Sequence, residues 1–443
     1  MTFLPDLAER LSDVARRGRI PGAAVAVRQG DLLAEAATGV LNVSTGVEAT
    51  TDSLFHIGSV AKLYTALLVM ELVEEGRVDL DEPVRRYLPD FRLADAEAAA
   101  ALTTRHLLTH TGGFDGDLFE DTGRGDDCVD RYLAVVGGAR KFAAPGELFS
   151  YCNSGFVVLG ALVARLRGAV WEAVVRERLL APMSLDHTTV YAEEAILFRA
   201  AAGHFEDAPS GQLRVTERWA MHRALGPAFS AISAAPRDMA AFGRRFLDDS
   251  PVVSAMTAPA VPAVNGTLVR QWGLGVMIYD FGATTVWGHS GYHRGQSSYL
   301  RIVPEHDLVI AASGNVGGAL PLSDELVDGL VTELTGARPA SLPVPPRTPS
   351  RVDVAPLVGR YQGPMVTYRV DAADLGVSVT RLPSPEGVRQ GDGESTVHYV
   401  HYDGDMFLTA EPMGGDHPTI TFVDGGRFLH DGRAHPRVGP AGA

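Results

Sequence analysis

A serine and a lysine three residues apart are the side chains of this sequence best placed to do chemistry together. Ser59 and Lys62 stand in "HIGSVAKLYTALLVMELVEEG", residues 56–76, where an apolar segment begins. Residues three apart share one face of a helix, so the two side chains are expected to project together. The start of such a helix would add positive potential and free N–H groups where an oxyanion could form.

The lysine is informative because almost every other basic residue of the chain is an arginine. Of 39 Lys and Arg residues, only Lys62 and Lys141 are lysines. Arginine keeps its proton in proteins, whereas a buried lysine loses its proton readily. A neutral amine at Lys62 could therefore take the hydroxyl proton of Ser59. The alternative is a serine that caps a helix, followed by a surface lysine, because this short motif also occurs by chance.

Two further motifs follow in the chain. "FSYCNSGFVVLG" places Tyr151 and Asn153 just before another apolar helix, and "VWGHSGYHRGQSSYLRI" places His289 to Gly291 between two strand patterns. With the serine and lysine above, they resemble the S-x-x-K, Y-x-N and K-T-G boxes of the penicillin-recognising serine enzymes, in the class C β-lactamase and D,D-peptidase branch. "GRVDLDEPVRRYLPDF", "LTTRHLLTHTGG" and "LLAPMSLDHT" are also similar to this family, and the resemblance spans residues 5–335.

The resemblance implies a role for each matching position. Ser59 would be the nucleophile that forms an acyl-enzyme. Lys62 and Tyr151 would form the proton relay, with Tyr151 as a phenolate beside the ammonium. Asn153 would hold the amide on the acyl side of the substrate. The backbone N–H groups of Ser59 and Tyr292 would form the oxyanion hole.

The third box departs from the family pattern. His289 stands where many members have lysine, followed by Ser290 and Gly291. Imidazole titrates near neutral pH, so a permanent cation for a substrate carboxylate is no longer assured. Esterases, D-amino-acid amidases and transacylases of this family commonly carry such a histidine. The resemblance therefore implies that His289 contributes to substrate binding and transition-state charge, and it weakens the case for antibiotic hydrolysis.

The order of the expected elements predicts how the catalytic part is built. Residues 1–17 show the spacing of an amphipathic helix, and residues 23–42 read as strand, tight turn and strand. Strand patterns return over residues 272–314, and a helix follows to residue 336. Between these ends the patterns are mostly helical. We expect an α+β domain over residues 1–336, an α/β sandwich with an antiparallel sheet and a helical insertion, which is the β-lactamase/transpeptidase-like fold.

The composition changes after this helix. Residues 337–352 are rich in proline and are expected to form a semi-rigid extended linker. Short alternating strands then fill residues 353–443, which predicts a small all-β barrel, lipocalin-like in type. We expect the barrel to dock against the catalytic part. Its last strand carries Arg433, which could grip a substrate carboxylate with two hydrogen bonds, unless it is simply a surface charge.

Composition narrows the classes of function. The 443 residues carry a net charge of −15, which opposes nucleic acid or an anionic membrane as a partner. No apolar run approaches the roughly 18 residues that a membrane helix needs. The first residues include Asp6, Glu9 and Asp13 and lack the apolar core of a signal peptide. We expect a cytoplasmic protein without metal, nucleotide or other cofactor, because no His, Cys or Gly-rich motif has the required spacing.

These observations predict a serine acyl-enzyme hydrolase or acyltransferase. Its substrate would be an ester, thioester or amide of a peptide-like or small acyl group. The C-terminal barrel adds a resemblance to penicillin-binding-protein-type thioesterases and amide synthases, which implies transfer of the acyl group to an amine in natural-product biosynthesis. The alternatives are a D-amino-acid peptidase or amidase, a carboxylesterase, and, from another class, a non-catalytic peptide-binding protein. The acyl donor, the acceptor, the stereochemistry and the oligomeric state stay open.

Overall fold

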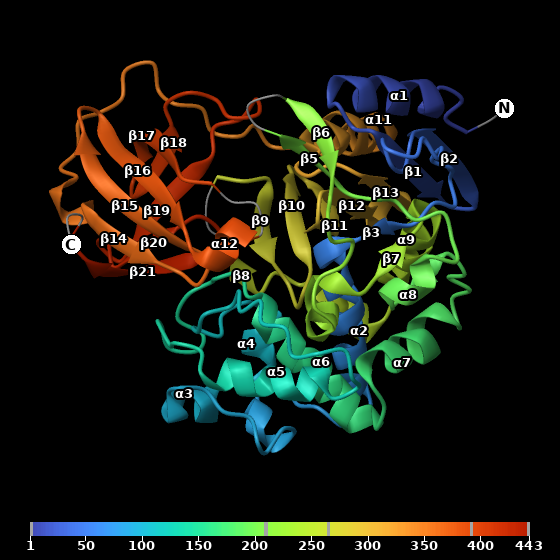
Figure 1. Ribbon diagram of the computed structural model, residues 1–443, viewed down its shortest axis with the longest axis horizontal. Coiled ribbons are helices and arrows are strands. Elements are labelled where there is room, and N and C mark those ends of the chain that lie inside the picture. The colour runs from blue at the N-terminus through green and yellow to red at the C-terminus, as the bar shows by residue number, and fades with distance from the viewer. Residues whose placement is uncertain (1–2, 208–210, 264–265, 390–392, 441–443) are drawn as a thin grey trace.

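The largest sheet of the protein draws its strands from both ends of the catalytic part. The computed structural model describes residues 3–207, 211–263, 266–389 and 393–440. Within these residues, eight antiparallel strands lie in the order β2-β1-β13-β12-β11-β10-β9-β8 (Figure 1). The strands are β1 Gly22–Gln29, β2 Leu32–Gly39, β8 Val261–Pro262, β9 Val269–Trp272, β10 Met277–Phe281, β11 Thr284–His293, β12 Gln296–Val303 and β13 Leu308–Gly314. The pairing of β1 with β13 confirms the predicted sheet.

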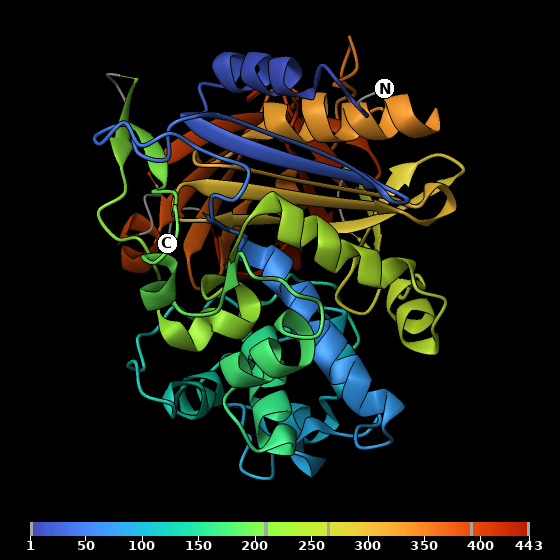
Figure 2. The same cartoon turned by 90° about the vertical axis from the view of Figure 1, so that its right-hand side faces the viewer.

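Both faces of this sheet are covered. Side chains alternate between the faces of a strand, and on β1 Val25 and Val27 pack in one core while Ala26 packs in the other. The first core lies under helices α1 (Leu7–Arg17) and α11 (Asp328–Thr335). Figure 2 shows these two helices, blue and orange, above the sheet and the remaining helices below it.

The helical insertion forms the second core. Helix α2 is buried on all sides from Ala61 to Met70, as its continuous apolar pattern predicts. Among the described helices, none is long and apolar enough to cross a membrane. The helices on this side are α2 Ala61–Glu74, α3 Ala96–Ala101, α4 Thr104–Leu108, α5 Cys128–Gly137, α6 Asn153–Arg167, α7 Trp171–Val175, α8 Ala192–Ala195, α9 Pro236–Gly243 and α10 Pro251–Thr257. Two small sheets join β3 Phe55–His56 with β7 Ser233–Ala234 and β4 Thr188–Thr189, and β5 His204–Asp207 with β6 Gln212–Val215.

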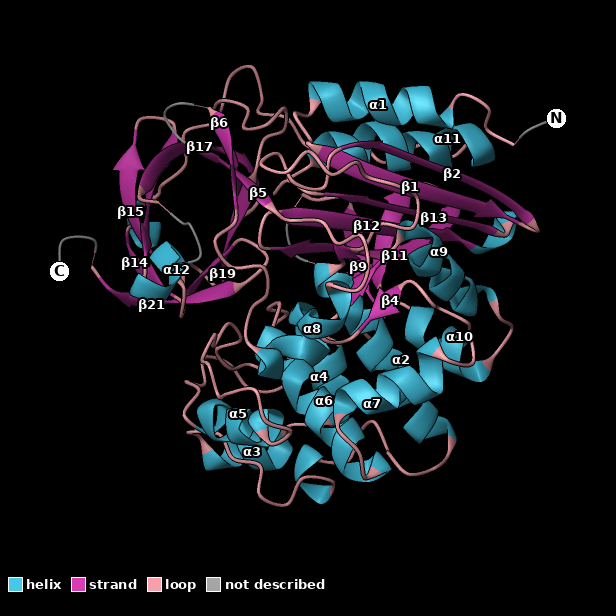
Figure 3. Ribbon diagram, turned by 45° about the vertical axis from the view of Figure 1, so that its right-hand side comes forward, coloured by secondary structure: helices cyan, strands magenta, loops and turns pink. Residues whose placement is uncertain are grey.

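The C-terminal region forms a closed antiparallel barrel, as predicted (Figure 3). Closure pairs every edge strand, so no open edge remains to pair with another chain. The division at residues 336 and 352 stays a prediction. The strands are β14 Gly359–Gln362, β15 Val366–Ala373, β16 Gly376–Pro383, β17 Ser395–Asp403, β18 Met406–Thr409, β19 Thr419–Val423, β20 Phe428–His430 and β21 Ala434–Gly439, with helix α12 at Pro385–Arg389.

The barrel contacts the catalytic part through its last hairpin. The backbone N–H of Ala434 donates to the Ser150 hydroxyl at 3.0 Å, and Arg427 forms an ion pair with Glu147 at 2.8 Å. Phe428 packs against Ala143 in a small shared apolar cluster. The hairpin between β20 and β21 is therefore attached to the segment that leads into α6.

A buried ion pair joins the sheet to α11. Arg301 on β12 and Asp328 on α11 lie 2.9 Å apart, and each side chain is only 2% exposed. The Arg301 guanidinium also lies 3.8 Å from the centre of the Tyr279 ring. Tyr279 in turn lies 3.2 Å from the hydroxyl of Ser290, in the third sequence box. The pair thus supports the strand that carries this box.

We expect Asp328→Ala to destabilise the protein strongly, because it leaves the Arg301 charge buried without a partner. The cost expected for such a change is about 3–5 kcal/mol in the free energy of unfolding, measured by urea denaturation. Glu333 lies on α11 like Asp328, but it pairs with Arg10 of α1 where both side chains are partly exposed. Glu333→Ala should therefore cost at most about 1 kcal/mol. Equal losses in the two variants would contradict this account.

Candidate active site

Two glycines allow the strand of the third box to lie against the serine. Ser59 lies in a short 3-10 helix, η1 (Gly58–Val60), immediately before α2. Gly58 has φ of 55°, and a Cβ there would come 2.5 Å from the backbone N of Tyr292. A Cβ on Gly291 would come 1.9 Å from the Ile57 oxygen. A side chain at either position would push β11 away from Ser59.

The amine of Lys62 is fully buried and contacts three oxygen atoms. Its Nζ lies 2.7 Å from Asn153 Oδ1, 2.9 Å from the Ala228 carbonyl oxygen and 3.2 Å from Ser59 Oγ. The amide and carbonyl oxygens can only accept hydrogen bonds. A neutral amine would donate its two protons to them and direct its lone pair at Ser59. Burial lowers the pKa of Lys62 well below its usual value, which favours this neutral form.

A chain of polar contacts runs from Lys62 to the barrel. Asn153 Nδ2 donates to Asp117 Oδ1 at 2.6 Å, which fixes the orientation of the amide because a carboxylate only accepts. The other carboxylate oxygen of Asp117 forms an ion pair with Arg433. Both ends of the Asn153 side chain are thus occupied by protein groups. The expected substrate-amide role of Asn153 and carboxylate role of Arg433 stay predictions, since each would need these contacts to rearrange.

The ring of Tyr151 lies near two basic side chains, the Lys62 amine and the Arg433 guanidinium. Lys62 Nζ is 4.7 Å from the centre of its ring, and the Arg433 guanidinium is 5.1 Å from it. The backbone N–H of Tyr151 donates to the Gly432 carbonyl at 3.0 Å, so the barrel also holds its main chain. The phenol is hydrogen-bonded to Ser59, but burial is the larger effect and raises the pKa of Tyr151. The phenolate expected from the sequence is therefore disfavoured, and a neutral phenol that can donate a proton takes its place.

His289 lies behind the reacting groups. It is fully buried, and its ring centre lies 6.5 Å from that of Tyr151 and 5.6 Å from that of Trp272. Its Nδ1 lies 2.6 Å from the Ser290 carbonyl oxygen, so Nδ1 carries the proton and Nε2 is an acceptor. Burial and the neighbouring Lys62 lower the pKa of His289 to about 3. At neutral pH His289 is uncharged, so it does not provide the positive charge that a lysine would provide at this position of the third box.

A pocket of about 750 Å³ opens onto Ser59 between the catalytic part and the barrel. Tyr151, Asn153, Gly291 and Tyr292 line it, whereas His289 does not. The barrel contributes Arg433 and its neighbours. Aromatic side chains make up much of the rest of the wall: Phe119, Phe149, Phe229, Trp272 and Tyr368. The pocket therefore has a largely aromatic and apolar wall, with polar side chains next to the serine.

Two residues near the site have structural roles. The thiol of Cys152 accepts the backbone N–H of Gly155 at 3.2 Å and caps α6. Burial raises the pKa of Cys152 to about 12, which removes it as a thiolate nucleophile. His110, with φ of 56°, accepts the Cys152 backbone N–H at 3.0 Å and shapes the loop beside the pocket. Across the described residues, no group of three or more His, Cys, Asp or Glu is placed to hold a metal ion.

The structure adds Asp117 and the carbonyl of Ala228 to the residues that the sequence motifs single out. Asp117 lies in "TGGFDGDLFED", where several carboxylates follow one another without a distinguishing spacing. Ala228 contributes only a backbone oxygen, from the π-turn η5 (Gly226–Ser230). Neither has a sequence signal, because each is defined by a contact across more than 30 positions.

Comparison with known proteins identifies related sequences. The Beta-lactamase family model matches residues 7–326. Penicillin-binding protein 4 of Amycolatopsis lactamdurans is 37% identical over 369 residues, covering 80% of this chain and 96% of the relative. Esterase EstB of Burkholderia gladioli is 34% identical over 198 residues, covering 40% of this chain and 50% of the esterase.

Solved structures extend the likeness to the barrel. The crystal structure of SurE aligns with a TM-score of 0.79 and 27% identity over 98% of both chains. A D-amino acid amidase from Ochrobactrum anthropi SV3 aligns with a TM-score of 0.65 and 24% identity, over 75% of this chain and 99% of the amidase. At that identity the amidase shows a shared fold alone.

We expect Arg433→Gln to move the acid limb of the pH–rate profile toward higher pH. The charge of Arg433 lowers the pKa of Lys62, whereas the charge of Asp117 raises the pKa of Lys62. Removing the guanidinium therefore favours the protonated amine. The measurement is kcat/KM for a small neutral ester from about pH 5 to about pH 9, roughly two units on either side of neutrality. Arg437→Gln, whose guanidinium bonds to the Pro356 carbonyl, is the control. An unmoved limb in Arg433→Gln would refute the coupling.

The buried imidazole of His289 should make stability fall in acid. The pKa of His289 is about 3 in the folded protein against 6.5 for an ordinary histidine, so between these values the unfolded chain binds more protons. The free energy of unfolding then drops as pH falls through this window, by up to about 1.4 kcal/mol per pH unit for one group. His289→Gln should flatten the dependence measured by urea denaturation, whereas His398→Gln, at an exposed site, should leave it unchanged. An unaltered slope in His289→Gln would count against a buried neutral histidine.

Proposed function

The chain belongs to the Beta-lactamase family, and on that premise we propose that Ser59 takes an acyl group from its substrate and passes it to water or to an amine. The family is one of serine hydrolases, and the protein is such an enzyme. The observation that carries the proposal is the set of contacts of the Lys62 amine. Two of its three neighbours are oxygens that can only accept hydrogen bonds, and the third is the Ser59 hydroxyl.

Acylation would begin with transfer of the Ser59 proton to Lys62 Nζ. The Ser59 oxygen then bonds to the substrate carbonyl carbon, and the carbonyl electron pair moves to its oxygen. The backbone N–H groups of Ser59 and Tyr292 would receive this oxyanion. Collapse of the intermediate breaks the bond to the leaving group, which takes its proton from the Tyr151 phenol. Lys62 then returns a proton to Tyr151.

Deacylation would use the same groups in reverse order. The acceptor, water or an amine, gives its proton to Lys62 as it attacks the acyl carbon of the ester on Ser59. The bond to the Ser59 oxygen then breaks, and the Lys62 ammonium gives its proton to this oxygen, which restores the Ser59 hydroxyl and the neutral amine. Lys62 is neutral at the start of acylation and again at the start of deacylation. The pKa of Lys62 would therefore govern both steps.

The pocket supports a peptide-like acyl group. Aromatic side chains of the catalytic part line the pocket, and Tyr368 and Arg433 of the barrel line it as well, so an extended acyl group would have apolar surface from both parts to contact. SurE, similar over 98% of both chains, has been solved with D-Leu. We infer that this protein acts on the ester, thioester or amide of a peptide-like substrate and that an amine acceptor competes with water.

Lys62→Arg tests the base directly. The substitution keeps a basic side chain of similar volume, but a guanidinium stays protonated and cannot accept the Ser59 proton, so turnover of a small ester should fall by about 10²–10⁴-fold. Lys141→Arg is the matched control, because Lys141 is the other lysine of the chain and pairs with Asp95 at the surface. Near-normal turnover in Lys62→Arg would refute the assignment.

Labelling separates this function from a non-catalytic binding protein. A fluorophosphonate should add to Ser59, seen as a mass increase that Ser59→Ala lacks. The acceptor is then identified by offering a peptide-like ester, thioester and amide with and without an added amine. Amide product formed faster than hydrolysis supports a transacylase, and hydrolysis alone supports an esterase or amidase. Absence of any adduct would favour the binding protein.

A further inference from the structure

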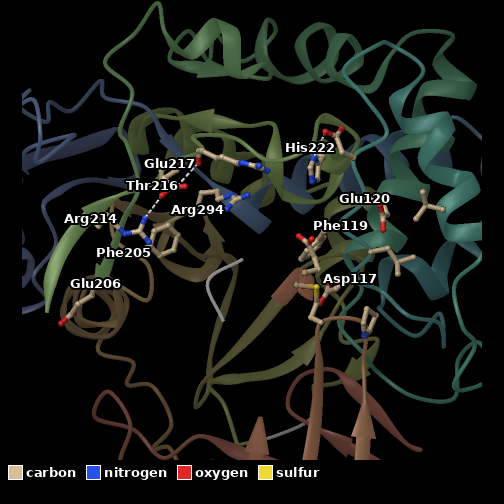
Figure 4. A pocket seen from close by; sticks show the side chains of 17 residues that line it. Asp117, Phe119, Glu120, Phe205, Glu206, Arg214, Thr216, Glu217, His222 and Arg294 are labelled. Atoms are coloured by element: carbon tan, nitrogen blue, oxygen red, sulfur yellow. Dashed lines mark hydrogen bonds and ion pairs between the residues drawn. The ribbon is translucent and has the colours of Figure 1, made fainter. Parts of the chain in front are cut away.

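A second, charged pocket continues from the serine pocket. It holds about 690 Å³ and shares Asp117, Phe119 and Arg294 with the pocket that opens onto Ser59. Figure 4 shows Arg294 with Arg214 and Glu217 on one side of this space, and Asp117, Phe119 and Glu120 on the other. A substrate long enough to leave the serine pocket would enter this space.

Most charged groups that line the second pocket are paired with protein groups. Arg214 lies 3.4 Å from Glu217, His222 lies 3.4 Å from Asp121, and Glu206 pairs with Arg19 at 2.7 Å. These contacts leave little charge for a ligand.

Arg294 differs from these groups. Within the part of the chain that the structure describes, it forms no ion pair, and its Nε is buried without a hydrogen-bond acceptor. Its guanidinium faces a like charge from Arg218, and burial together with this repulsion lowers the pKa of Arg294, while Glu386 acts in the opposite direction. Nearly all buried donors in proteins find a partner, which makes Arg294 unusual. Among the described residues no carboxylate forms an ion pair with it, so its guanidinium lines both pockets as an unneutralised cation.

The backbone holds Arg294 firmly in place. It lies at the β11–β12 turn with φ of 45°, unusual for a residue that is not glycine. The backbone of Gly203 packs so closely on this turn that a Cβ there would come 1.8 Å from the Arg294 oxygen. His293, the preceding residue, lines the serine pocket, is 1% exposed and has no partner for either ring nitrogen among the described residues. The turn therefore presents unsatisfied polar groups from a rigid position.

We propose that Arg294, assisted by Arg218, binds an oxyanion of the substrate, a carboxylate or a phosphate that lies away from the bond being cleaved. An anion in the pocket would accept hydrogen bonds from the Arg294 guanidinium where it lines the wall, and it would offset the repulsion between the two guanidinium groups. The site rests on the proposed function, since the same substrate reaches Ser59. It specifies the substrate class further: an acyl compound with an anionic group at its far end.

Matched esters test the proposal. The probes are p-nitrophenyl esters of a series of acyl chain lengths that end in a carboxylate, a phosphate monoester or a neutral carboxamide. At the best length, one anionic series should exceed the carboxamide about tenfold in kcat/KM, the value of one charge-assisted hydrogen bond. Arg294→Gln should bring this ratio close to one. Arg214→Gln, at a paired arginine of the same pocket, should keep it.

The outcomes separate the two proposals. A preference for carboxylate alone or for phosphate alone identifies the source of the anion and supports the site, provided that Arg294→Gln removes it. A ratio near one in the unmodified protein at every length, or a ratio that survives Arg294→Gln, overturns the site even if Ser59 is acylated. If no fluorophosphonate adduct forms, calorimetric titration of the protein with glutarate and inorganic phosphate decides: binding lost in Arg294→Gln supports the site, and absent binding overturns it.

Discussion

The buried amine of Lys62 is the constraint on which the site depends. Exclusion of water lowers the pKa of an amine toward neutrality, and here helix α2 is buried on every side from Ala61 to Met70. The two acceptors, Asn153 Oδ1 and the Ala228 carbonyl, come from separate segments that pack around this helix. They set the direction of the remaining lone pair. The core of the helical region thus also lowers the pKa of the Lys62 amine.

The barrel takes part in this arrangement although it lies more than 290 positions after Ser59 in the chain. Its β20–β21 hairpin reaches the site, where Gly432 holds the Tyr151 backbone and Arg433 pairs with Asp117. Arg433 also acts on the Lys62 amine by its charge: it lowers the pKa of Lys62, whereas the charge of Asp117 raises that pKa. A substrate anion that competed for Arg433 would therefore alter the base as well as bind. A closed barrel suits this role, because its paired strands hold the hairpin rigidly.

Replacement of a lysine by His289 in the third box changes the electrostatics of the pocket. The imidazole is buried and uncharged, so the positive potential at the serine comes from groups placed elsewhere, including Arg433 of the barrel. In the second pocket, which adjoins the serine pocket, Arg294 adds a second cationic side chain. Positive charge has moved from the strand behind Tyr151 to the pocket walls, which suits substrates that extend away from the serine.

The sequence by itself determined the family, the class of enzyme and the order of the elements. The spacing of Ser59 and Lys62, the two later boxes and the alternating strands at both ends predicted the sheet, the buried helix and the barrel, because these signals are local. Tertiary structure alone decided the protonation states and the partners. Burial makes His289 neutral and Tyr151 a phenol, contrary to the phenolate expected, and desolvation cannot be seen in a motif. The role of Asp117 likewise depends on contacts between distant segments, which only the folded chain brings within hydrogen-bonding distance.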